Sequence, residues 1–316
     1  MRKKRIRKII FTLFAFGLIS GYIGFEIWKE KSRPPILEIY IFNKESGRSM
    51  LIRTPDDKRI IIDGGSNKDV VRQISKIIPF FSRRIEAVVA TNDESKNVSG
   101  LVDIVERYKV EEAYVPKYTL ENIGIASSTD LVYKTFLLAL NKNGVRSKKV
   151  VEGERIILGQ DLSINFLFPA EITSFKYSKS SAPEILFNLS FGKNNFLFLG
   201  NASNKTQKYI ASSSSAFGKI DVLIVSHSAL PSRITKQLVD KFHPSDLVFS
   251  QRITKDTSID DNFEESSDNV STGTSSKKKV INYLNYLKQE NKFNTKEGTV
   301  KITSDGYSFD VEKIGE

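Results

Sequence analysis

The feature that most constrains the fold of this chain is an alternation of strand-type and helix-type patterns over residues 37–142. Short runs rich in Ile, Val and Leu have the length of buried strands, and stretches with apolar residues at helical spacing separate them. Such alternation is typical of a layered α/β fold, in which helices cover the faces of a sheet. We expect strands at 37–42, 50–53, 59–62, 87–90 and 112–115, and helices at 70–78, 100–107 and 129–142.

The second half of the chain continues with strand-type pairs and then with further strands and helices in alternation. Its order of elements is similar to that of the first half, although the sequence itself does not repeat. A helix and a terminal hairpin close the chain. We expect strands at 155–158, 162–168, 185–190, 195–199, 222–225, 247–250, 299–303 and 307–311, and helices at 204–212, 232–241 and 280–289.

One segment, residues 254–279, interrupts this pattern. Ser, Thr, Asp and Asn dominate it and apolar residues almost vanish. Such a segment does not bury enough apolar surface to offset the entropy cost of ordering, so we predict a disordered insertion. The domain is then expected to span residues 37–253, with residues 280–316 completing it as a C-terminal helix and hairpin.

The N-terminus predicts a membrane anchor. Residues 1–8 form a basic tail, and residues 9–28 are apolar apart from Glu26. About 20 helical residues at about 1.5 Å each span roughly 30 Å, the thickness of a bilayer core. A cleavable signal peptide is the alternative, but its apolar run is shorter and ends in an Ala-x-Ala-like site, which this run lacks. We expect one transmembrane helix, a linker at 29–36, a cytoplasmic N-terminus and a domain outside the cytoplasmic membrane.

The charge of the chain belongs largely to that anchor. Residues 1–33 hold nine Lys and Arg and two Glu, which accounts for +7 of the net +11, so the rest of the chain carries only +4. The basic cluster Arg146, Lys148 and Lys149 is expected to be a solvated face. The chain has no Cys, which excludes disulfides and thiolate metal sites.

Candidate site residues lie in the segments that end strand-type runs. Residues 91–100 connect the strand at 87–90 to a helix, and Asp63-Gly64-Gly65 ends the strand at 59–62. The two glycines permit a sharp turn, and the Asp63 carboxylate is suited to accept hydrogen bonds from loop amides. In a layered fold, sites usually lie at this edge of a sheet.

From Leu37 onward the chain resembles the metallo-β-lactamase domain at the end of ComEC-type competence proteins, the DNA-uptake channels. The resemblance covers about 37–250 and, more weakly, 280–311, and it implies an αββα metallo-β-lactamase-like sandwich that binds zinc. The channel's many transmembrane helices have no counterpart here. The matching segments are 37–39, 51–57, 60–65, 79–85, 196–202 and 221–228.

The residues that the resemblance assigns to zinc depart from the family's pattern. The main ligand motif, Thr-His-x-His/Asp-x-Asp-His-x-x-Gly, keeps its frame in Thr91 and Gly100, but its four ligand positions hold Asn92, Glu94, Lys96 and Asn97. After Gly200, the family's bridging Asp is replaced by Asn201. Ser228 stands where a second His would follow His227, and the family's Gly-Gln-Gly-Asp segment reads Glu45-Ser46-Gly47-Arg48.

These replacements weaken zinc binding for a chemical reason. Zinc takes imidazole, thiolate or carboxylate donors and three protein ligands in a catalytic site, whereas only Glu94 and His227 remain suitable here. The Lys96 ammonium would repel a dication by roughly twice the 4 kcal/mol that acts between unit charges about 4 Å apart. We predict that no catalytic residue, no metal ligand and no cofactor remains, and that Asn92, Glu94, Lys96, Asn97, Asn201 and His227 are vestigial ligand positions. The frame residues Asp63, Gly64, Gly65, Thr91, Gly100 and Gly200 are then structural.

Two alternatives concern the charges in this loop. Lys96 could replace the lost cation by pairing with Glu94, Asp93 or Asp63, or it could simply point into solvent. The same three carboxylates could instead offer oxygen ligands to magnesium or calcium.

The sequence therefore predicts a membrane-anchored, non-catalytic relative of the competence domain with a binding or scaffolding role at the cell envelope. Its partner would be DNA during uptake or another envelope protein, and no small-molecule substrate is identifiable. The rival hypothesis is a metal-dependent hydrolase of phosphodiesters that uses an unorthodox site.

Overall fold

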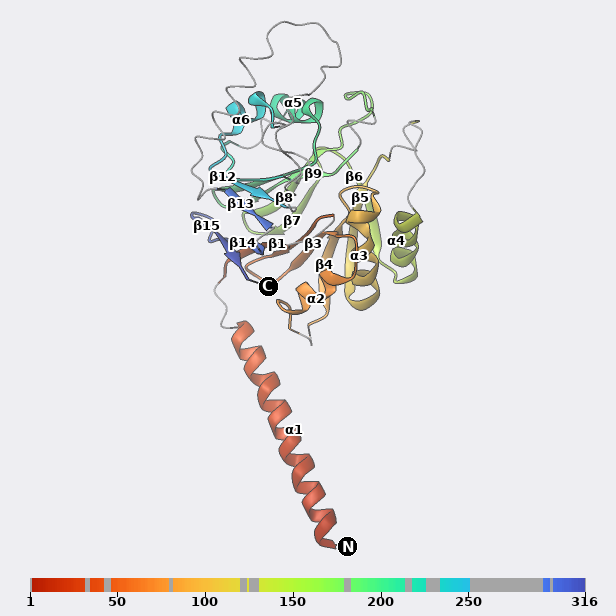
Figure 1. The fold of residues 1–316 in the computed structure, drawn as a ribbon, viewed down its shortest axis with the longest axis vertical. Coiled ribbons are helices and arrows are strands. Elements are labelled where there is room, and N and C mark those ends of the chain that lie inside the picture. Colours follow the sequence, from red (N-terminus) through yellow and green to blue (C-terminus); the bar gives the residue numbers. More distant parts are fainter. Residues whose placement is uncertain are drawn as a thin grey trace, which may run out of the picture. The chain divides into compact units, whose positions relative to one another are not determined.

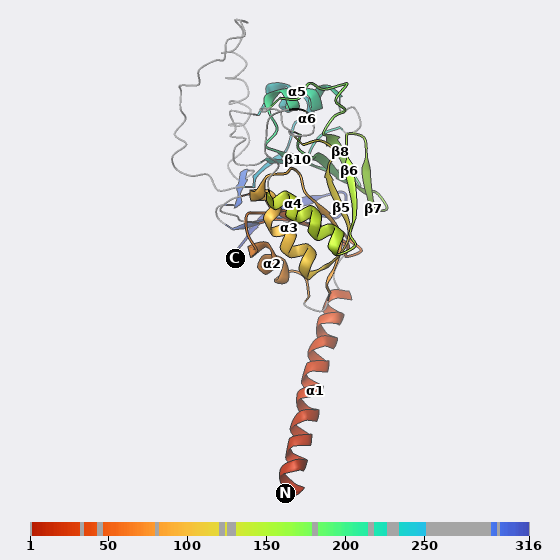
Figure 2. The ribbon, with the colours of Figure 1, turned by 90° about the vertical axis from the view of Figure 1, so that its right-hand side faces the viewer.

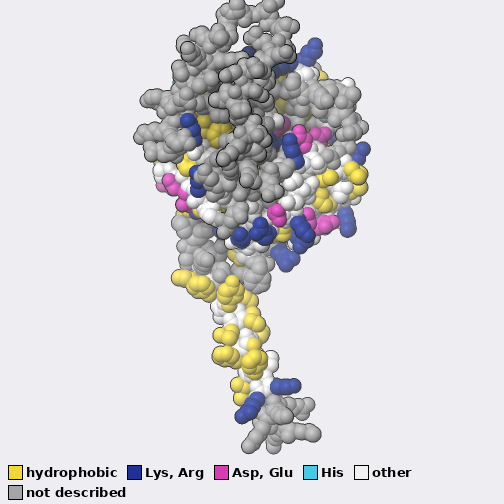
Figure 3. Space-filling model, in the orientation of Figure 1, with side chains coloured by type: hydrophobic (Ala, Val, Ile, Leu, Met, Phe, Trp, Pro, Cys, Tyr) yellow, Lys and Arg dark blue, Asp and Glu magenta, His cyan; other side chains and the backbone are white. Residues whose placement is uncertain are grey.

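The computed structural model describes residues 2–31, 35–42, 47–79, 82–119, 124, 131–178, 183–213, 218–225, 234–250, 292–295 and 298–315. The chain divides into two units, Met1–Pro35 and Ile36–Glu316. The first contains the helix α1 (Arg2–Lys31), in which Arg7–Phe25 is long and apolar enough to cross a membrane. Its apolar side chains are exposed, and Figure 3 shows them gathered along the helix, with Lys and Arg at one end.

The second unit is built on two β-sheets (Figure 1). The first sheet has eight strands, and the second has seven. In spatial order the first contains β15 (Phe309–Ile314), β14 (Thr299–Ser304), β1 (Leu37–Ile41), β2 (Ser49–Arg53), β3 (Arg59–Gly64), β4 (Arg84–Val89), β5 (Lys109–Pro116) and β6 (Arg146–Val150). The second contains β13 (Lys292–Asn294), β12 (Asp246–Phe249), β11 (Val222–Val225), β10 (Asn194–Gly200), β9 (Leu186–Phe191), β8 (Leu162–Phe168) and β7 (Arg155–Gly159).

Helices cover the outer face of each sheet, as the two views in Figures 1 and 2 agree. The first sheet carries α2 (Asp69–Ser75), α3 (Ser95–Arg107) and α4 (Leu131–Lys142), and the second carries α5 (Asn204–Ser213) and α6 (Lys236–Phe242). Three buried apolar clusters fill the spaces between the four layers: one between the sheets and one under each set of helices. The expected αββα sandwich, preceded by one helix that is suited to span a membrane, is confirmed.

The strand β3 shows why these sequences form this fold. Ile60 and Ile62 point into the cluster between the sheets, while Ile61 points into the cluster under α2, α3 and α4. Successive side chains of a strand alternate between faces, so a strand that is covered on both faces reads as an unbroken apolar run. This is the reason why the central strands were recognisable from sequence.

Several element bounds are shifted by a few residues, and the largest differences from the expectations concern three elements. The helix α3 begins at Ser95, earlier than the expected residue 100. The prediction missed its first turn because that turn is largely polar and has no apolar periodicity. The helical hydrogen bonds nevertheless begin there, since Val98 N donates to Glu94 O at 3.1 Å. Two strands were not expected: β6, whose residues Arg146–Lys149 are exposed at a sheet edge, and the three-residue β13. Charged side chains are common on edge strands, where backbone pairing decides the structure rather than apolar content. The predicted insertion at 254–279 and the helix at 280–289 lie outside the described residues.

Candidate functional site

The centre of the candidate site is Asp63, at the end of β3. Asp63 is fully buried and has a left-handed backbone with φ of 55°. Its Oδ1 accepts a hydrogen bond from Thr91 N at 2.8 Å, and its Oδ2 accepts one from Thr91 Oγ1 at 2.7 Å. Thr91 follows β4, which is parallel to β3. The carboxylate therefore ties together the ends of two neighbouring strands, through the type of loop amide bond that its place in the sequence suggested.

Two glycines bring α3 against the end of β3. A Cβ on Gly64 would lie 2.3 Å from Leu101 N, and a Cβ on Gly100 would lie 2.1 Å from Gly64 O. Gly100 N also donates to Gly65 O at 3.2 Å. No side chain fits between the two backbones, and this close approach sets the position of the first turn of α3 beside Asp63.

A buried arginine, Arg48, lies just before β2, and its guanidinium occupies the buried space beside Asp63, which we call the pocket. Its Nε donates to Asp63 Oδ2 at 3.2 Å, and its Nη2 donates to Thr91 Oγ1 at 2.7 Å. The same Nη2 lies 2.5 Å from Glu184 Oε1, in an ion pair whose geometry is not that of an aligned hydrogen bond. Arg48 is only 4% exposed. One guanidinium therefore forms ion pairs with two buried carboxylates.

The second sheet closes the pocket around that guanidinium. Gly200 ends β10 with φ of 51°, and a Cβ there would lie 2.4 Å from Glu184 Oε1 and 2.9 Å from Arg48 Nη1. The guanidinium carbon is 5.6 Å from the ring centre of Phe198, within the range of a cation–π contact. Glu184 lies just before β9, so the ion pairs of Arg48 connect the end of β3 in the first sheet to the start of β9 in the second.

The charges of this cluster are strongly perturbed. Burial raises the pKa of Asp63, against the opposing effect of Arg48 and of the Thr91 donors. Burial also raises the pKa of Glu184, and the charge of Asp63 adds to that rise while Arg48 opposes it. Burial disfavours the charged form of Arg48, but the Glu184 and Asp63 carboxylates outweigh it and raise the pKa of the guanidinium. The guanidinium therefore stays charged, and both acids interact with this one cation.

The side-chain amides of Asn92 and Asn97, two of the predicted site residues, bond to each other and to the backbone. Asn97 Nδ2 donates to Asn92 Oδ1 at 2.9 Å, and Asn97 Oδ1 accepts from Arg48 N at 3.1 Å. Asn92 Oδ1 also accepts from Glu94 N at 3.2 Å. Both amides are buried. They hold the loop that carries Arg48 on the first turn of α3.

The other candidate positions lie outside this buried cluster. Lys96 Nζ is 2.9 Å from Glu94 Oε2, but the two side chains are 48% and 50% exposed. Asn201 is exposed, and His227 lies outside the described residues. Of the three partners suggested for Lys96, the structure pairs it with Glu94, but this pair lies at the surface. The buried cation of the site is Arg48.

Sequence reasoning missed both Arg48 and Glu184 as members of the site. The signal for Arg48 was present, because it stands where the resembled family has the Asp of Gly-Gln-Gly-Asp, a reversal of charge. Nothing in the residues around Glu184 marks it, since its role depends on the approach of the two sheets.

A zinc ion does not fit the residues described here. In the described part of the chain, no group of three His, Asp or Glu is placed to hold a metal. The two carboxylates that point into the pocket are already paired with Arg48. A dication about 4 Å from the guanidinium would meet a repulsion of roughly 8 kcal/mol at an effective dielectric constant of about 20.

Several solved structures are similar in fold. The metallo-β-lactamase fold protein YhfI from Bacillus subtilis is 10% identical with a TM-score of 0.48, and the match covers 84% of this chain and 99% of that chain. Zn²⁺-bound PqqB from Methylobacterium extorquens is 12% identical with a TM-score of 0.45, covering 82% and 86%. CmlA, a diiron β-hydroxylase from Streptomyces venezuelae, is 12% identical with a TM-score of 0.43, covering 69% of this chain and 45% of that chain.

No protein-family model and no curated protein matches this sequence. The match to the hydroxylase spans less than half of that protein.

Proposed function

We propose that this protein is a membrane-anchored, non-catalytic metallo-β-lactamase-like protein with a binding or scaffolding role at the cell envelope. One observation carries the proposal: the Arg48 guanidinium fills the pocket and pairs with Asp63 and Glu184. A buried cation at this place removes both the space and the negative charge that an activating metal needs.

The location follows from α1 and its flanking charges. Its span Arg7–Phe25 is suited to cross a membrane, and the basic residues that precede it favour a cytoplasmic N-terminus. We therefore infer that the domain faces outward. A reporter enzyme that is active on only one side of the membrane, fused after residue 316, tests the orientation. Activity on the cytoplasmic side would reverse it.

The partner that fits the ComEC-like resemblance best is DNA at the cell surface. The mild positive charge of the domain is compatible with weak contacts to phosphates, whose affinity falls steeply with added salt. Binding of labelled single-stranded and duplex DNA to the full-length protein in detergent, measured over a salt series, tests this step. If the protein shows no salt-dependent affinity and instead co-purifies with another envelope protein, scaffolding is the better description.

Metal analysis of the purified full-length protein decides between this proposal and the rival hydrolase. We expect no stoichiometric transition metal and no hydrolysis of bis(p-nitrophenyl) phosphate or DNA above the level of a protein-free control. Stoichiometric zinc, together with hydrolysis that a chelator abolishes, would establish the rival function and overturn the non-catalytic one.

A further inference from the structure

We propose that Arg48 is a tethered cation that takes over the electrostatic role of a bound metal ion, and that the pocket accepts a divalent cation once this guanidinium is removed. The inference rests on the proposed non-catalytic function, because it requires that the natural protein holds Arg48, rather than a metal, between its carboxylates. It concerns a cation site that the fold still contains in latent form.

The first argument is the placement of the two carboxylates. Asp63 ends β3 of the first sheet and Glu184 leads into β9 of the second, and Arg48 lies between them at 3.2 Å and 2.5 Å. Both acids are buried, with exposures of 0% and 8%. Two buried carboxylates on either side of one guanidinium stay ionised only while that cation is present, so the ionised form of this junction of the sheets depends on a positive charge.

The second argument is that this cation has no substitute. Among the described residues, Arg48 is the one cation paired with Asp63 and Glu184. Lys96 pairs with Glu94 at the surface. Removal of the guanidinium therefore leaves two uncompensated acids and an empty volume between them.

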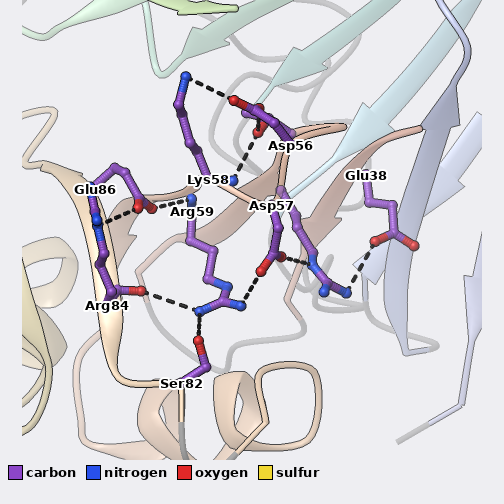
Figure 4. A network of polar contacts seen from close by, with 10 residues as sticks. Glu38, Asp56, Asp57, Lys58, Arg59, Ser82, Arg84 and Glu86 are labelled. Carbon is purple, nitrogen blue, oxygen red and sulfur yellow. Dashed lines mark hydrogen bonds and ion pairs between the residues drawn. The ribbon is translucent and has the colours of Figure 1, made fainter. Parts of the chain in front are cut away.

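A second buried arginine provides a matched comparison at the opposite ends of the same strands. Arg53 lies 2.6 Å from Asp57 and 3.7 Å from Glu38, and its side chain is 7% exposed. Here each acid has another cation: Arg59 pairs with Asp57, and Lys301 lies 3.5 Å from Glu38. Figure 4 shows Asp57 between neighbouring basic groups in this network. Loss of Arg53 thus leaves both acids compensated and creates no vacant cation position.

The chemistry of the pocket selects the class of cation. Without Arg48, the polar groups that contacted its guanidinium are the Asp63 and Glu184 carboxylates and the Thr91 hydroxyl, all of them oxygen donors. Such donors suit hard cations such as Mn²⁺, Mg²⁺ and Ca²⁺ rather than zinc. The test uses Mn²⁺ because its binding is also visible by electron paramagnetic resonance.

The experiment compares the thermal unfolding of full-length variants in detergent with increasing Mn²⁺. A cation that binds only the folded state raises the Tm with its concentration. We expect Arg48→Ala to have a lower Tm than the natural protein without metal, and to recover it progressively as Mn²⁺ is added. The natural protein, Arg53→Ala and the charge-retaining Arg48→Lys should show no such rise. The double variant Arg48→Ala, Glu184→Gln should lose most of it, because one of the two carboxylate ligands is gone.

Each outcome decides the proposal. If Arg48→Ala folds only when Mn²⁺ is present, the proposal is supported as strongly as by a rise in Tm. If it ignores Mn²⁺, or remains unfolded at every Mn²⁺ concentration while Arg48→Lys folds, the proposal is wrong. An equal rise for Arg53→Ala would also overturn it, because the effect would then follow the loss of any buried arginine. Stoichiometric metal in the natural protein would instead refute the proposed function, so the two failures are distinguishable.

Discussion

The contact between α3 and β3 gives the sharpest test of the site's geometry, through the substitution Gly100→Ala. On helix propensity alone, Ala in place of a Gly within a helix stabilises by about 1 kcal/mol. The structure reverses this sign. The new methyl carbon would lie 2.1 Å from Gly64 O, 2.7 Å from Val70 Cγ1 and 2.8 Å from Asn67 O.

Two of these three neighbours are backbone carbonyls, which do not rotate away as a side chain does. The helix must therefore move off the strand, and the added methyl in a packed interface costs about 1–3 kcal/mol. Because the shortest approach is far below ordinary van der Waals contact, we expect a cost at the upper end of that range. After the gain in propensity, the net loss is about 2 kcal/mol, which is about 4–8 °C in Tm.

Urea denaturation followed by far-UV circular dichroism measures this loss. Fluorescence is not suitable, because the single tryptophan, Trp28, lies in α1 and does not report on the domain. Gly159→Ala is the matched control, since nothing lies within 4 Å of its added Cβ, and it should change stability by less than about 0.5 kcal/mol. A Gly100→Ala protein as stable as the natural one would refute the close approach, and with it the placement of Asn97 and Arg48 around Asp63.

Three further outcomes follow from the site. Burial raises the pKa of Glu184, so the folded state binds this proton more firmly than the unfolded state does, and the free energy of unfolding falls as pH rises from about 4 through the folded pKa. Glu184→Gln should reduce this fall, which urea denaturation between pH 4 and pH 8 measures. An unchanged slope of stability against pH would contradict the assignment. Lys96→Ala should cost less than about 0.5 kcal/mol, because its pair with Glu94 is half exposed; a loss of several kcal/mol would mean that Lys96 is the structural cation. Gly200→Ala should destabilise by more than about 1 kcal/mol, because its φ is 51° and the new Cβ meets Glu184 Oε1 at 2.4 Å; a neutral result in the same assay would argue against the closure around Arg48.

Much of the fold was predictable because it depends on local patterns. Runs such as residues 60–62 and 222–225 are buried on both faces, so their composition alone identifies strands. The anchor helix was predictable for the same reason, since its length and apolar content are local. The edge strand β6 was not, because its exposed basic residues have no apolar pattern and its conformation comes from pairing with β5.

The sequence by itself determined the layered α/β class and the helix suited to a membrane, and it showed amide rather than imidazole side chains at Asn92 and Asn97. Only the tertiary structure decided which cation pairs with the buried acids Asp63 and Glu184. Lys96 lies in the loop that the sequence analysis singled out, yet its side chain is at the surface, while Arg48 is buried between two sheets. The physical reason is that apolar periodicity depends only on residues close together in the sequence. An ion pair such as that of Arg48 with Glu184 forms only when packing brings distant segments together and removes them from water.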